Sequence, residues 1–377
     1  MAFVVNSIDF FVSHRIAIGL RLLSLGYEVH LIAPGPCPEE IINQGFRYHA
    51  VSISRDGKGP LGELLTVYEL YRLFKKIKPS VVHLVTIKPY LYGGIAARLA
   101  GVASVVSAVA GLGILFSQNS FKSRLLRIAL YPLYKIAFGH HNQRVIFQNL
   151  DDMQILEKFA GLDPKKSILI RGAGVDLQKY TFKDEPVGVP VISLASRLLK
   201  DKGIVEFVEA SRILRLRGVK AEFRLIGTPD LGNANTVTPN QLDGWQCAGL
   251  VKCLGYRKDI AQLFGESNIV TLPSYYGEGL PKVLIEAAAC GRAVITTDHP
   301  GCRDAVKVGE TALLIPIKDS EALANAIETL IGNPTLRARL GMSGRQLAEE
   351  VFDIQKVIDS HVKIYEGLIA AYKSASA

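Results

Sequence analysis

The sequence has 377 residues, enough for two domains of ordinary size, each with its own hydrophobic core. Hydrophobic residues make up 49% and charged residues 21% of the chain, which excludes a disordered, collagen-like or disulfide-scaffold protein. Lysine and arginine outnumber aspartate and glutamate by 44 to 35, and the net charge of +9 favours an anionic partner such as a phosphate-bearing small molecule, a membrane surface or a nucleic acid.

Apolar runs that alternate with amphipathic stretches are typical of parallel α/β folds, in which each strand needs a crossover helix. The strands predicted in the first half cover residues 3–6, 28–33, 81–85, 103–109 and 144–147. Those predicted in the second half cover residues 190–195, 222–226, 251–254, 269–273, 293–297 and 312–315. This order predicts two doubly wound, Rossmann-like domains.

The domain boundary is expected within residues 180–189, which carry proline, glycine and charge without periodicity. This hinge gives a first domain of residues 1–180 and a second of residues 181–353. The last helical pattern, residues 354–377, follows the final strand and is expected to pack back onto the first domain.

Cysteine usage and hydropathy indicate a cytoplasmic protein. The five cysteines form no CxxC pair and share no zinc-ligand spacing with the eight histidines, which predicts free thiols. The N-terminal apolar run is too short for a signal peptide and lacks a basic region before it. The longest weakly polar run, residues 102–116, spans about 15 residues and is too short for a transmembrane helix. Any membrane contact should therefore be peripheral.

A dinucleotide-binding fingerprint begins at Gly172 and Gly174, after an apolar run. The third glycine of the pattern is absent because Leu177 takes its place, and no amphipathic helix follows. We interpret the two glycines as a tight turn, so that a nicotinamide-dependent oxidoreductase is not favoured.

The segment 271–291 places two glutamates eight residues apart, Glu278 in a loop and Glu286 in the helix that Pro281 begins. Gly279 and Leu280 then lie at a helix N-terminus, whose free N–H groups attract phosphate or hydroxyl-rich ligands. Glu286 could accept hydrogen bonds from the vicinal hydroxyls of a ribose. A helix cap and a solvated glutamate explain this pattern almost as well when it is taken alone.

A basic loop supports the ligand-binding interpretation. Arg197, Lys200 and Lys202 follow the strand at 190–195 and precede a helix that starts near Gly203. Cations at such a turn can neutralise a leaving diphosphate, although they could also be ordinary surface charges. Both loops follow parallel strands at their C-terminal ends, where doubly wound sheets bind ligands.

Several segments of the second half resemble family 4 of the retaining GT-B glycosyltransferases, in order and at family spacing: residues 196–197, 202–203, 223–227, 254–259, 272–274, 278–281, 286–287 and 300–304. The resemblance implies a GT-B fold with two Rossmann-like domains facing a cleft. It also implies that the second domain holds a sugar-nucleotide donor and the first domain an acceptor.

The resemblance carries family roles onto particular residues of the second domain. Arg197 and Lys202 would bind the donor diphosphate, and Glu286 the ribose. Glu278, with the backbone of the two residues after it, would bind the transferred sugar, so that Arg197, Lys202 and Glu278 form the catalytic set. The complete donor site would comprise Arg197, Lys202, Tyr256, Arg257, Glu278, Gly279, Leu280 and Glu286, with Tyr256 and Arg257 near the base.

Segments in the first half of the chain indicate the class of acceptor. Residues 6–15 and 86–94 form polar and aromatic loops after predicted strands, and together with residues 107–113 they resemble the family subset that extends bacterial polyprenyl-diphosphate-linked oligosaccharides. That subset includes enzymes that add N-acetylgalactosamine in glycan and O-antigen assembly. The implied acceptor-binding residues are Asn6, Ser13, His14, Arg15, Thr86, Lys88, Gly111 and Gly113, with Lys88 as our candidate for the acceptor diphosphate.

The general base is left open. Many family members place a histidine just before a glycine in the loop 107–113, whereas Ala110 precedes Gly111 here. His14 or no protein base must therefore be considered, since the leaving diphosphate oxygen can itself take the acceptor proton in a retaining reaction. Arg197 and Lys202 would stabilise that oxygen. No cofactor and no metal are expected, because Asp201 and the pair 151–152 lack the setting of a DxD donor loop.

Two basic amphipathic stretches could bind an anionic bilayer from the cytoplasmic side. Residues 121–138 carry Lys122, Arg124, Arg127 and Lys135, and residues 70–78 carry further cations. Ordinary crossover helices with solvated basic faces would show the same pattern. Pro132 predicts a kink in the first stretch.

The resemblance thus implies a retaining glycosyltransferase that moves N-acetylgalactosamine or a related hexose from a uridine diphosphate (UDP) sugar to a polyprenyl-diphosphate-linked saccharide at the inner face of a bacterial membrane. The alternative within the same fold is a UDP-sugar 2-epimerase, which would need no acceptor. A nucleic-acid-binding protein would explain the positive charge, but no compact basic and aromatic recognition element is present.

Overall fold

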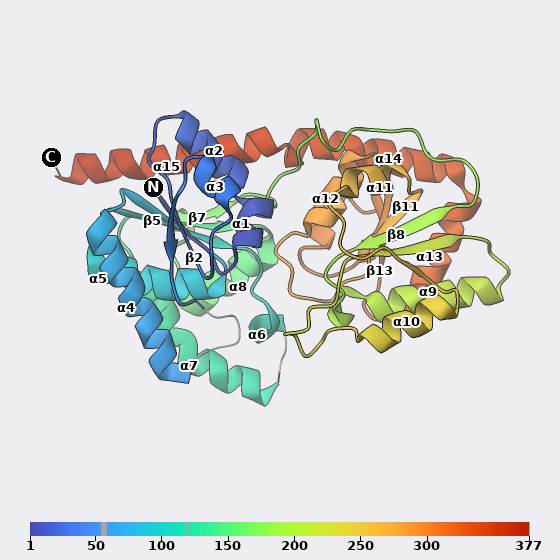
Figure 1. Ribbon diagram of the computed structural model, residues 1–377, viewed down its shortest axis with the longest axis horizontal. Helices are drawn as coiled ribbons and strands as arrows, with labels where there is room; N and C mark the ends of the chain where they lie inside the picture. The colour runs from blue at the N-terminus through green and yellow to red at the C-terminus, as the bar shows by residue number, and fades with distance from the viewer. Residues whose placement is uncertain (54–58, 118–119, 377) are drawn as a thin grey trace. The chain divides into compact units, whose positions relative to one another are not determined.

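The computed structural model describes residues 1–53, 59–117 and 120–376 and divides into two compact units (Figure 1). The first unit comprises Met1–Ala173 and Gln355–Ala377, and the second comprises Gly174–Ile354. Each unit is built on a parallel sheet with helices on its faces, which confirms the predicted pair of doubly wound domains.

The described residues of the first unit form a seven-stranded sheet in the order β3-β2-β1-β4-β5-β6-β7. Its strands are β1 (Ala2–Val4), β2 (His30–Ala33), β3 (Arg47–Ala50), β4 (Val81–Val85), β5 (Ser104–Val109), β6 (Gln143–Phe147) and β7 (Ser167–Leu169). Its helices are α1 (Ile8–His14), α2 (Ile16–Ser24), α3 (Glu39–Asn43), α4 (Gly59–Ile77), the π-helix η1 (Pro89–Gly93), α5 (Gly94–Ala100), α6 (Ile114–Ser117), α7 (Phe121–Ala137), α8 (Leu150–Ala160) and the 3₁₀ turn η2 (Pro164–Lys166).

Both faces of this sheet are buried, which is why its central strands read as continuous apolar runs. Successive side chains of a strand point to opposite faces. Val4 of β1 and Leu84 of β4 therefore pack into the core beneath α4, α5 and α7, whereas Phe3 and His83 stack on each other on the other face, with ring centroids 5.2 Å apart. The second face is covered by α1 through Phe11.

The described part of the second unit holds a six-stranded sheet in the order β10-β9-β8-β11-β12-β13. Its strands are β8 (Val191–Ala195), β9 (Glu222–Ile226), β10 (Lys252–Cys253), β11 (Ile269–Leu272), β12 (Ala293–Thr297) and β13 (Ala312–Ile315). Its helices are η3 (Lys200–Lys202), α9 (Ile204–Leu216), α10 (Pro239–Cys247), α11 (Ile260–Gly265), α12 (Lys282–Ala289), η4 (Arg303–Ala305), α13 (Ser320–Gly332), α14 (Pro334–Leu347) and the π-helix η5 (Ala348–Phe352). All the strands predicted in this half are present.

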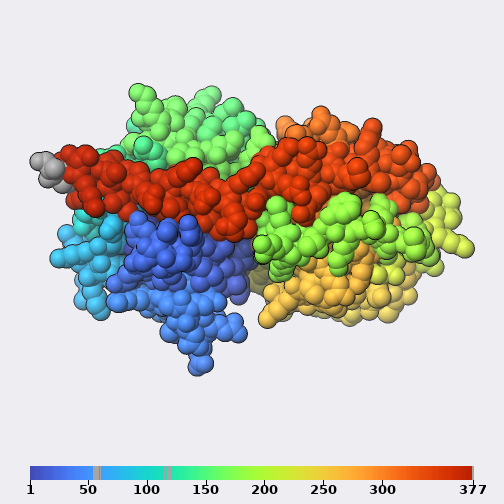
Figure 2. Space-filling view, turned by 90° about the horizontal axis from the view of Figure 1, so that it is seen from above, coloured from blue at the N-terminus to red at the C-terminus, as the bar shows by residue number. Residues whose placement is uncertain are grey.

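The C-terminal helix α15 (Ile354–Ser376) packs on the first unit, as predicted. Tyr365 lies within hydrogen-bond distance of His83, with 2.6 Å between the hydroxyl and Nδ1, and the Asn142 amide donates to the Leu368 carbonyl at 2.9 Å. Figure 2 shows this helix, in red, lying along the blue N-terminal elements of the same unit.

The boundary between the units lies between Ala173 and Gly174, before the hinge predicted at residues 180–189. The backbone N–H of Val175 donates to the Phe352 carbonyl at 2.7 Å, and that of Ile354 donates to the Val175 carbonyl at 3.0 Å. Tyr180 is buried in the core of the second unit. Although the segment 180–189 has the composition of a linker, its backbone is bound to the second unit and belongs to it.

Two predicted loops of the first unit are helical. Residues 6–15 form mainly α1, and residues 86–94 form mainly η1, so the chain turns into a helix almost at once after β1 and β4. The predicted turn at Gly172 and Gly174 is confirmed, since both residues have a positive φ, 76° and 79°.

Candidate active site

Two loops meet at the C-terminal edge of the second sheet. The loop after β8 carries Lys202, and the loop after the neighbouring strand β11 carries Glu278. The Lys202 ammonium donates to Oε1 of Glu278, and it lies 5.0 Å from the centroid of the Tyr276 ring. Each of the paired side chains is 12% exposed. The structure therefore brings together two of the three residues predicted to form the catalytic set.

Two glycines permit this close approach. Gly203 has a φ of 78°, and a Cβ at that position would lie 2.3 Å from the carbonyl oxygen of Pro273, so only glycine lets η3 contact the end of β11. Gly301 has a φ of 81°, and a Cβ there would lie 2.6 Å from the carbonyl oxygen of Glu278. The loops after β8, β11 and β12 are thus packed backbone to backbone at one edge.

Arg197, the third predicted catalytic residue, forms an ion pair with Asp230, with 2.7 Å between Nη1 and Oδ2. Asp230 belongs to the loop after β9, the other neighbour of β8 in the sheet. The guanidinium is half exposed at 46%, so it is available to an incoming anion that could compete with Asp230.

Glu286 lies on α12 and is buried, with 8% of its surface exposed. The Lys282 ammonium lies 3.5 Å from its Oε1. Burial raises the pKa of the Glu286 carboxyl, whereas Lys282 and Tyr180 act in the opposite direction.

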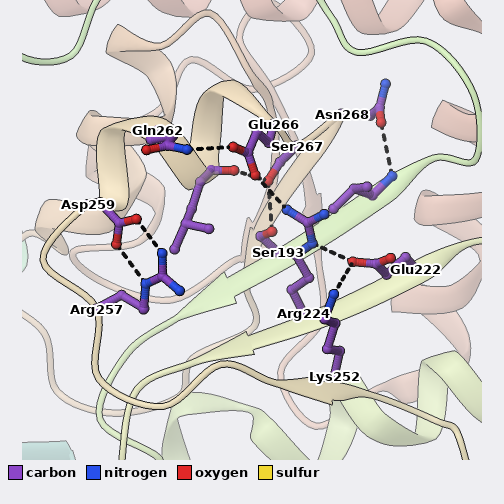
Figure 3. Close-up of polar contacts among 12 residues, drawn as sticks. Ser193, Glu222, Arg224, Lys252, Arg257, Asp259, Gln262, Glu266, Ser267 and Asn268 are labelled. Atoms are coloured by element: carbon purple, nitrogen blue, oxygen red, sulfur yellow. Dashed lines mark hydrogen bonds and ion pairs between the residues drawn. The ribbon is translucent and has the colours of Figure 1, made fainter.

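The residues predicted near the base lie between β10 and α11. Tyr256 is 71% exposed, and Nε of Arg257 donates to Oδ1 of Asp259 at 2.7 Å (Figure 3). In the same view, Arg224 of β9 pairs with Glu222 at 2.5 Å and with Glu266 of α11 at 3.3 Å. An exposed aromatic ring next to an anchored guanidinium offers a surface on which a base could stack.

The predicted acceptor residues of the first unit gather near the ends of β1, β4 and β5, which are neighbours in the sheet. Oδ1 of Asn6 and Oγ1 of Thr86 are both buried without a hydrogen-bond partner among the described residues. Thr86 has a φ of 75°, a strained conformation for a β-branched residue and one that is typical of functional sites. Gly111 and Gly113 follow β5 with φ of 104° and 64°.

A depression of about 370 Å³ lies at the ends of β1 and β2 and is lined by Asn6, Ser7, Ile8, Asp9, Pro34, Pro36 and Pro38. A larger cavity of about 450 Å³ lies at the opposite edge of the sheet, before β4 and β5, and contains none of the candidate donor or acceptor residues. Ligands of doubly wound folds bind at the carboxyl ends of strands, so the smaller depression fits the predicted acceptor position better.

Lys88 follows β4 directly, and its ammonium donates to Oε1 of Glu63 at 2.8 Å. Both side chains are 22% exposed. Lys88 therefore lies at the edge where an acceptor could reach it, with a carboxylate of α4 as its partner.

Of the three remaining acceptor candidates, two are accessible and one is not. Oγ of Ser13 lies 2.7 Å from Nδ1 of His14, whose ring stacks on Phe10 with centroids 4.2 Å apart. Arg15 is only 2% exposed, because it is enclosed between α1, α2 and Tyr365 of α15, and this burial lowers its pKa to about 10. Arg15, which is predicted to contact the acceptor, is therefore much less accessible than Ser13 and His14.

Comparison with known families decides the assignment. Residues 1–149 match the family described as glycosyl transferase 4-like, and residues 179–347 match the glycosyl transferases group 1. The chain belongs to these glycosyltransferases. The two matches correspond to the two units, so the group 1 match contains the Lys202–Glu278 pair and the 4-like match contains Lys88.

Two relatives resemble this glycosyltransferase over most of its length. One is the N,N'-diacetylbacillosaminyl-diphospho-undecaprenol alpha-1,3-N-acetylgalactosaminyltransferase of Campylobacter jejuni, 27% identical over 91% of this chain and 92% of that protein. The other is the UDP-Gal:alpha-D-GlcNAc-diphosphoundecaprenol alpha-1,3-galactosyltransferase of Escherichia coli, 27% identical over 81% of this chain and 80% of that protein.

A solved structure supports the GT-B fold of the glycosyltransferase. The Anabaena protein HepE in complex with UDP and glucose superposes with a TM-score of 0.77 at 20% sequence identity, covering 96% of this chain and 98% of that one. The GT-B fold predicted from the sequence is thus confirmed.

The donor-side loops of the glycosyltransferase contain residues to which the sequence analysis assigned no role in binding. Asp201 is 8% exposed, its Oδ1 has no hydrogen-bond partner in the described part of the chain, and its carbonyl accepts from the Tyr275 N–H at 2.9 Å. Ser274 donates to Glu278 at 3.2 Å, and Tyr276 lies under Lys202. No spacing rule marks these residues, because their roles depend on contact between loops far apart in sequence.

The helices predicted to bind membranes, α4 and α7, both pack against η1 and α5. No helix within the described residues combines the length and hydropathy that crossing a bilayer requires. Lys122, Arg124 and Lys135 of α7 are exposed and Arg127 is half-buried. Large apolar side chains are exposed on the same two helices: Leu61, Leu64, Leu65 and Tyr68 on α4, and Phe121, Leu125, Leu126 and Ile128 on α7.

Proposed function

We propose that this glycosyltransferase moves N-acetylgalactosamine or a related hexose from a UDP-sugar to a saccharide on a polyprenyl diphosphate, with retention of configuration, at the cytoplasmic face of the membrane. The observation that carries the proposal is the pairing of Lys202 with Glu278 at the C-terminal edge of the second sheet. A cation binds the diphosphate and a hydrogen-bond acceptor binds the hydroxyls of the attached sugar, and this pair places both kinds of group side by side.

In the proposed reaction, the bond between the anomeric carbon and the donor diphosphate oxygen breaks while an acceptor hydroxyl oxygen bonds to that carbon on the same face. The hydroxyl proton passes to the leaving diphosphate oxygen. Lys202 and Arg197 neutralise the charge that develops on the diphosphate, which is where electrostatic stabilisation contributes most. Glu278 accepts hydrogen bonds from hydroxyls of the transferred sugar.

The relatives support the lipid-linked acceptor. The Campylobacter jejuni and Escherichia coli proteins are both named as transferases that act on undecaprenyl-diphosphate-linked sugars. In this chain, Lys88 offers a cation for a phosphate, while the unpaired oxygens of Asn6 and Thr86 offer hydrogen-bond acceptors for sugar hydroxyls or an acetamido N–H.

Product analysis tests the proposal directly. The protein would be incubated with a panel of UDP-sugars, UDP-N-acetylgalactosamine first, with and without a detergent-solubilised polyprenyl-diphosphate monosaccharide, and the products analysed by mass spectrometry. Addition of one sugar that depends on the acceptor is expected. Conversion of the donor without an acceptor would instead establish the epimerase, and retention would be read from the anomeric configuration of the product by NMR.

Chelation of divalent metals is expected to leave the rate of transfer unchanged. Arg197 and Lys202 supply positive charge where a bound metal would otherwise be needed, so no step of the proposed reaction requires one. Initial rates with EDTA, and with added magnesium or manganese, check this. Loss of activity in EDTA that is restored by either metal would contradict it.

Membrane association is proposed for α4 and α7, because exposed apolar side chains beside cations are what an anionic bilayer surface binds. Replacing Arg124 and Arg127 by alanine is expected to weaken binding to anionic liposomes by about thirtyfold, since each of the two cations contributes about 1 kcal/mol near such a surface. Co-sedimentation with phosphatidylglycerol vesicles measures this.

The matched control removes Lys220 and Arg339, two exposed cations of the second unit, and should bind vesicles as the unmodified protein does. Equal losses in both double variants would show that overall charge, and not α7, determines binding.

A further inference from the structure

Ser274 lies where the loops after β8 and β11 meet in the second unit. It is fully buried, and its carbonyl accepts a hydrogen bond from the Thr297 hydroxyl at the end of β12. The next residue, Tyr275, donates its backbone N–H to the Asp201 carbonyl at 2.9 Å. The backbone around Ser274 is therefore fixed to the loop after β8 on one side and to the end of β12 on the other.

The Ser274 hydroxyl has partners from both loops. Its oxygen accepts from the Tyr276 N–H at 3.2 Å, which leaves the hydroxyl hydrogen for the other neighbours. Those neighbours are the Asp201 carbonyl at 3.3 Å and Oε1 of Glu278 at 3.2 Å. A hydroxyl has one hydrogen to donate, so Ser274 binds these two acceptors in competition.

Of the two acceptors, the carboxylate of Glu278 is the stronger. The Asp201 carbonyl already accepts from the Tyr275 N–H, and at a shorter distance. A hydrogen bond to an ionised oxygen is roughly twice as strong as a bond between neutral groups. The Ser274 hydrogen is therefore directed mainly at Oε1 of Glu278.

The Lys202 ammonium donates to the same oxygen of Glu278. Two donors from different loops thus hold one end of the carboxylate, which fixes the direction of the other oxygen, Oε2. In the proposed reaction Lys202 also binds the diphosphate, and a cation shared between two anions holds each of them less firmly. The hydrogen bond from Ser274 is then the one that keeps Oε1 in place.

We propose that Ser274 is a positioning residue for the transferred sugar: its hydroxyl holds Oε1 of Glu278 so that the carboxylate stays turned toward the sugar hydroxyls while Lys202 neutralises the diphosphate. Without that hydroxyl, the carboxylate can turn with Lys202 away from the sugar. The sugar part of the donor is then bound less firmly, whereas the nucleotide part is not affected. This inference rests on the proposed sugar-nucleotide donor.

The test compares a nucleotide with and without its sugar. Calorimetry would measure the Kd of UDP, and of the UDP-sugar that supports transfer in the product analysis, for the unmodified protein and for Ser274→Ala, which removes only the hydroxyl. We expect Ser274→Ala to weaken binding of the UDP-sugar about tenfold, the usual effect of a lost hydrogen bond to a charged group. The Kd of UDP should change by less than about twofold, because water can solvate Glu278 when no sugar is present.

A double-mutant cycle with Glu278→Ala separates positioning from support of the fold. If Ser274 acts through Glu278, Ser274→Ala should not weaken binding of the UDP-sugar further when Glu278→Ala is already present. A second loss of about tenfold in the double variant would show that Ser274 acts independently of Glu278 and would overturn the proposal.

Two results with the single variant would also overturn it. Equal weakening of UDP and of the UDP-sugar would show that Ser274 supports the fold of the unit and not the sugar contact, and unchanged binding of both would show that the hydroxyl has no role. If the unmodified protein binds no UDP, or if no UDP-sugar supports transfer, the proposed function itself fails, so the two failures are distinguishable.

The matched control is Ser193→Ala, which removes another buried serine hydroxyl from the same unit. Ser193 lies on β8, the strand next to β11, and its Oγ lies 2.7 Å from Oγ of Ser267 (Figure 3). The variant is expected to lower the melting temperature while leaving both Kd values unchanged. Melting curves would confirm that each variant is folded before binding is measured.

A second variant covers the case in which Ser274→Ala does not fold. Ser274→Cys keeps a similar shape but replaces the hydroxyl by a thiol, which is only a weak hydrogen-bond donor. It is expected to show the same selective loss for the UDP-sugar. Equal binding of the UDP-sugar by Ser274→Cys and the unmodified protein would overturn the proposal.

Discussion

Replacing Lys202 by alanine is expected to lower kcat for sugar transfer by about 10²–10³-fold, the usual effect of removing one group that stabilises developing negative charge. The Lys202 ammonium lies between Glu278 and the Tyr276 ring and is mostly shielded from water, which strengthens its interaction with an anion. Lys202→Ala should affect kcat more than KM, because the charge on the leaving diphosphate oxygen is greater in the transition state than in the bound donor. Initial rates at saturating donor and acceptor measure it.

The neighbouring Lys200 provides the comparison. It belongs to the same 3₁₀ turn, but its side chain is exposed. The fold-decrease in kcat caused by Lys200→Ala should be at least ten times smaller than the fold-decrease caused by Lys202→Ala. Similar losses in the two variants would mean that the general positive charge of the loop matters and not the placement of Lys202, which would contradict the proposed mechanism.

The central strands of the second sheet could be predicted because they are buried on both faces. In a parallel sheet covered by helices, each central strand reads as an apolar run, and β8, β11 and β12 are buried at every position. The two strands missed in the first unit, β3 and β7, lie at the two ends of their sheet and are partly exposed. An edge strand such as the segment 47–50 needs no apolar run, so hydropathy does not reveal it.

The part of the donor site that follows from sheet topology, namely which loops lie together, could be predicted from the sequence. Loops that leave neighbouring parallel strands at the same edge must meet, which is why Lys202 and Glu278 could be assigned to one site. The partner of Arg197 could not be predicted, because Asp230 lies in an irregular loop after β9. The burial of Arg15 could not be predicted either, since it depends on α15, which begins more than three hundred positions later in the chain.

One feature common to the cations proposed to bind phosphate is that each already has a carboxylate partner. The pairs are Arg197 with Asp230, Lys202 with Glu278 and Lys88 with Glu63. A phosphate that arrives at any of these sites must either share the cation with its carboxylate or displace the carboxylate. Each carboxylate therefore lowers the apparent affinity for the substrate while keeping a partly buried charge paired.

The acceptor site offers the clearest test of this competition. Lys88→Ala is expected to raise the KM for the lipid-linked acceptor about tenfold, the usual effect of losing a hydrogen bond to a charged group, while the Kd of UDP stays unchanged. Glu63→Gln removes the opposing charge and should change the acceptor KM in the opposite direction. It is expected to lower the acceptor KM by about two- to fivefold, in keeping with the modest strength of a partly exposed ion pair.

The directions in which Lys88→Ala and Glu63→Gln change the acceptor KM distinguish two roles of Glu63. If Glu63 only held Lys88 in place, both substitutions would raise the acceptor KM, because each would leave the ammonium missing or misplaced. If Glu63 competes with the acceptor diphosphate, Glu63→Gln lowers the KM, and the double variant shows the same KM as Lys88→Ala alone, since no cation then remains for the carboxylate to occupy. A KM that is unchanged in Lys88→Ala would remove Lys88 from the acceptor site.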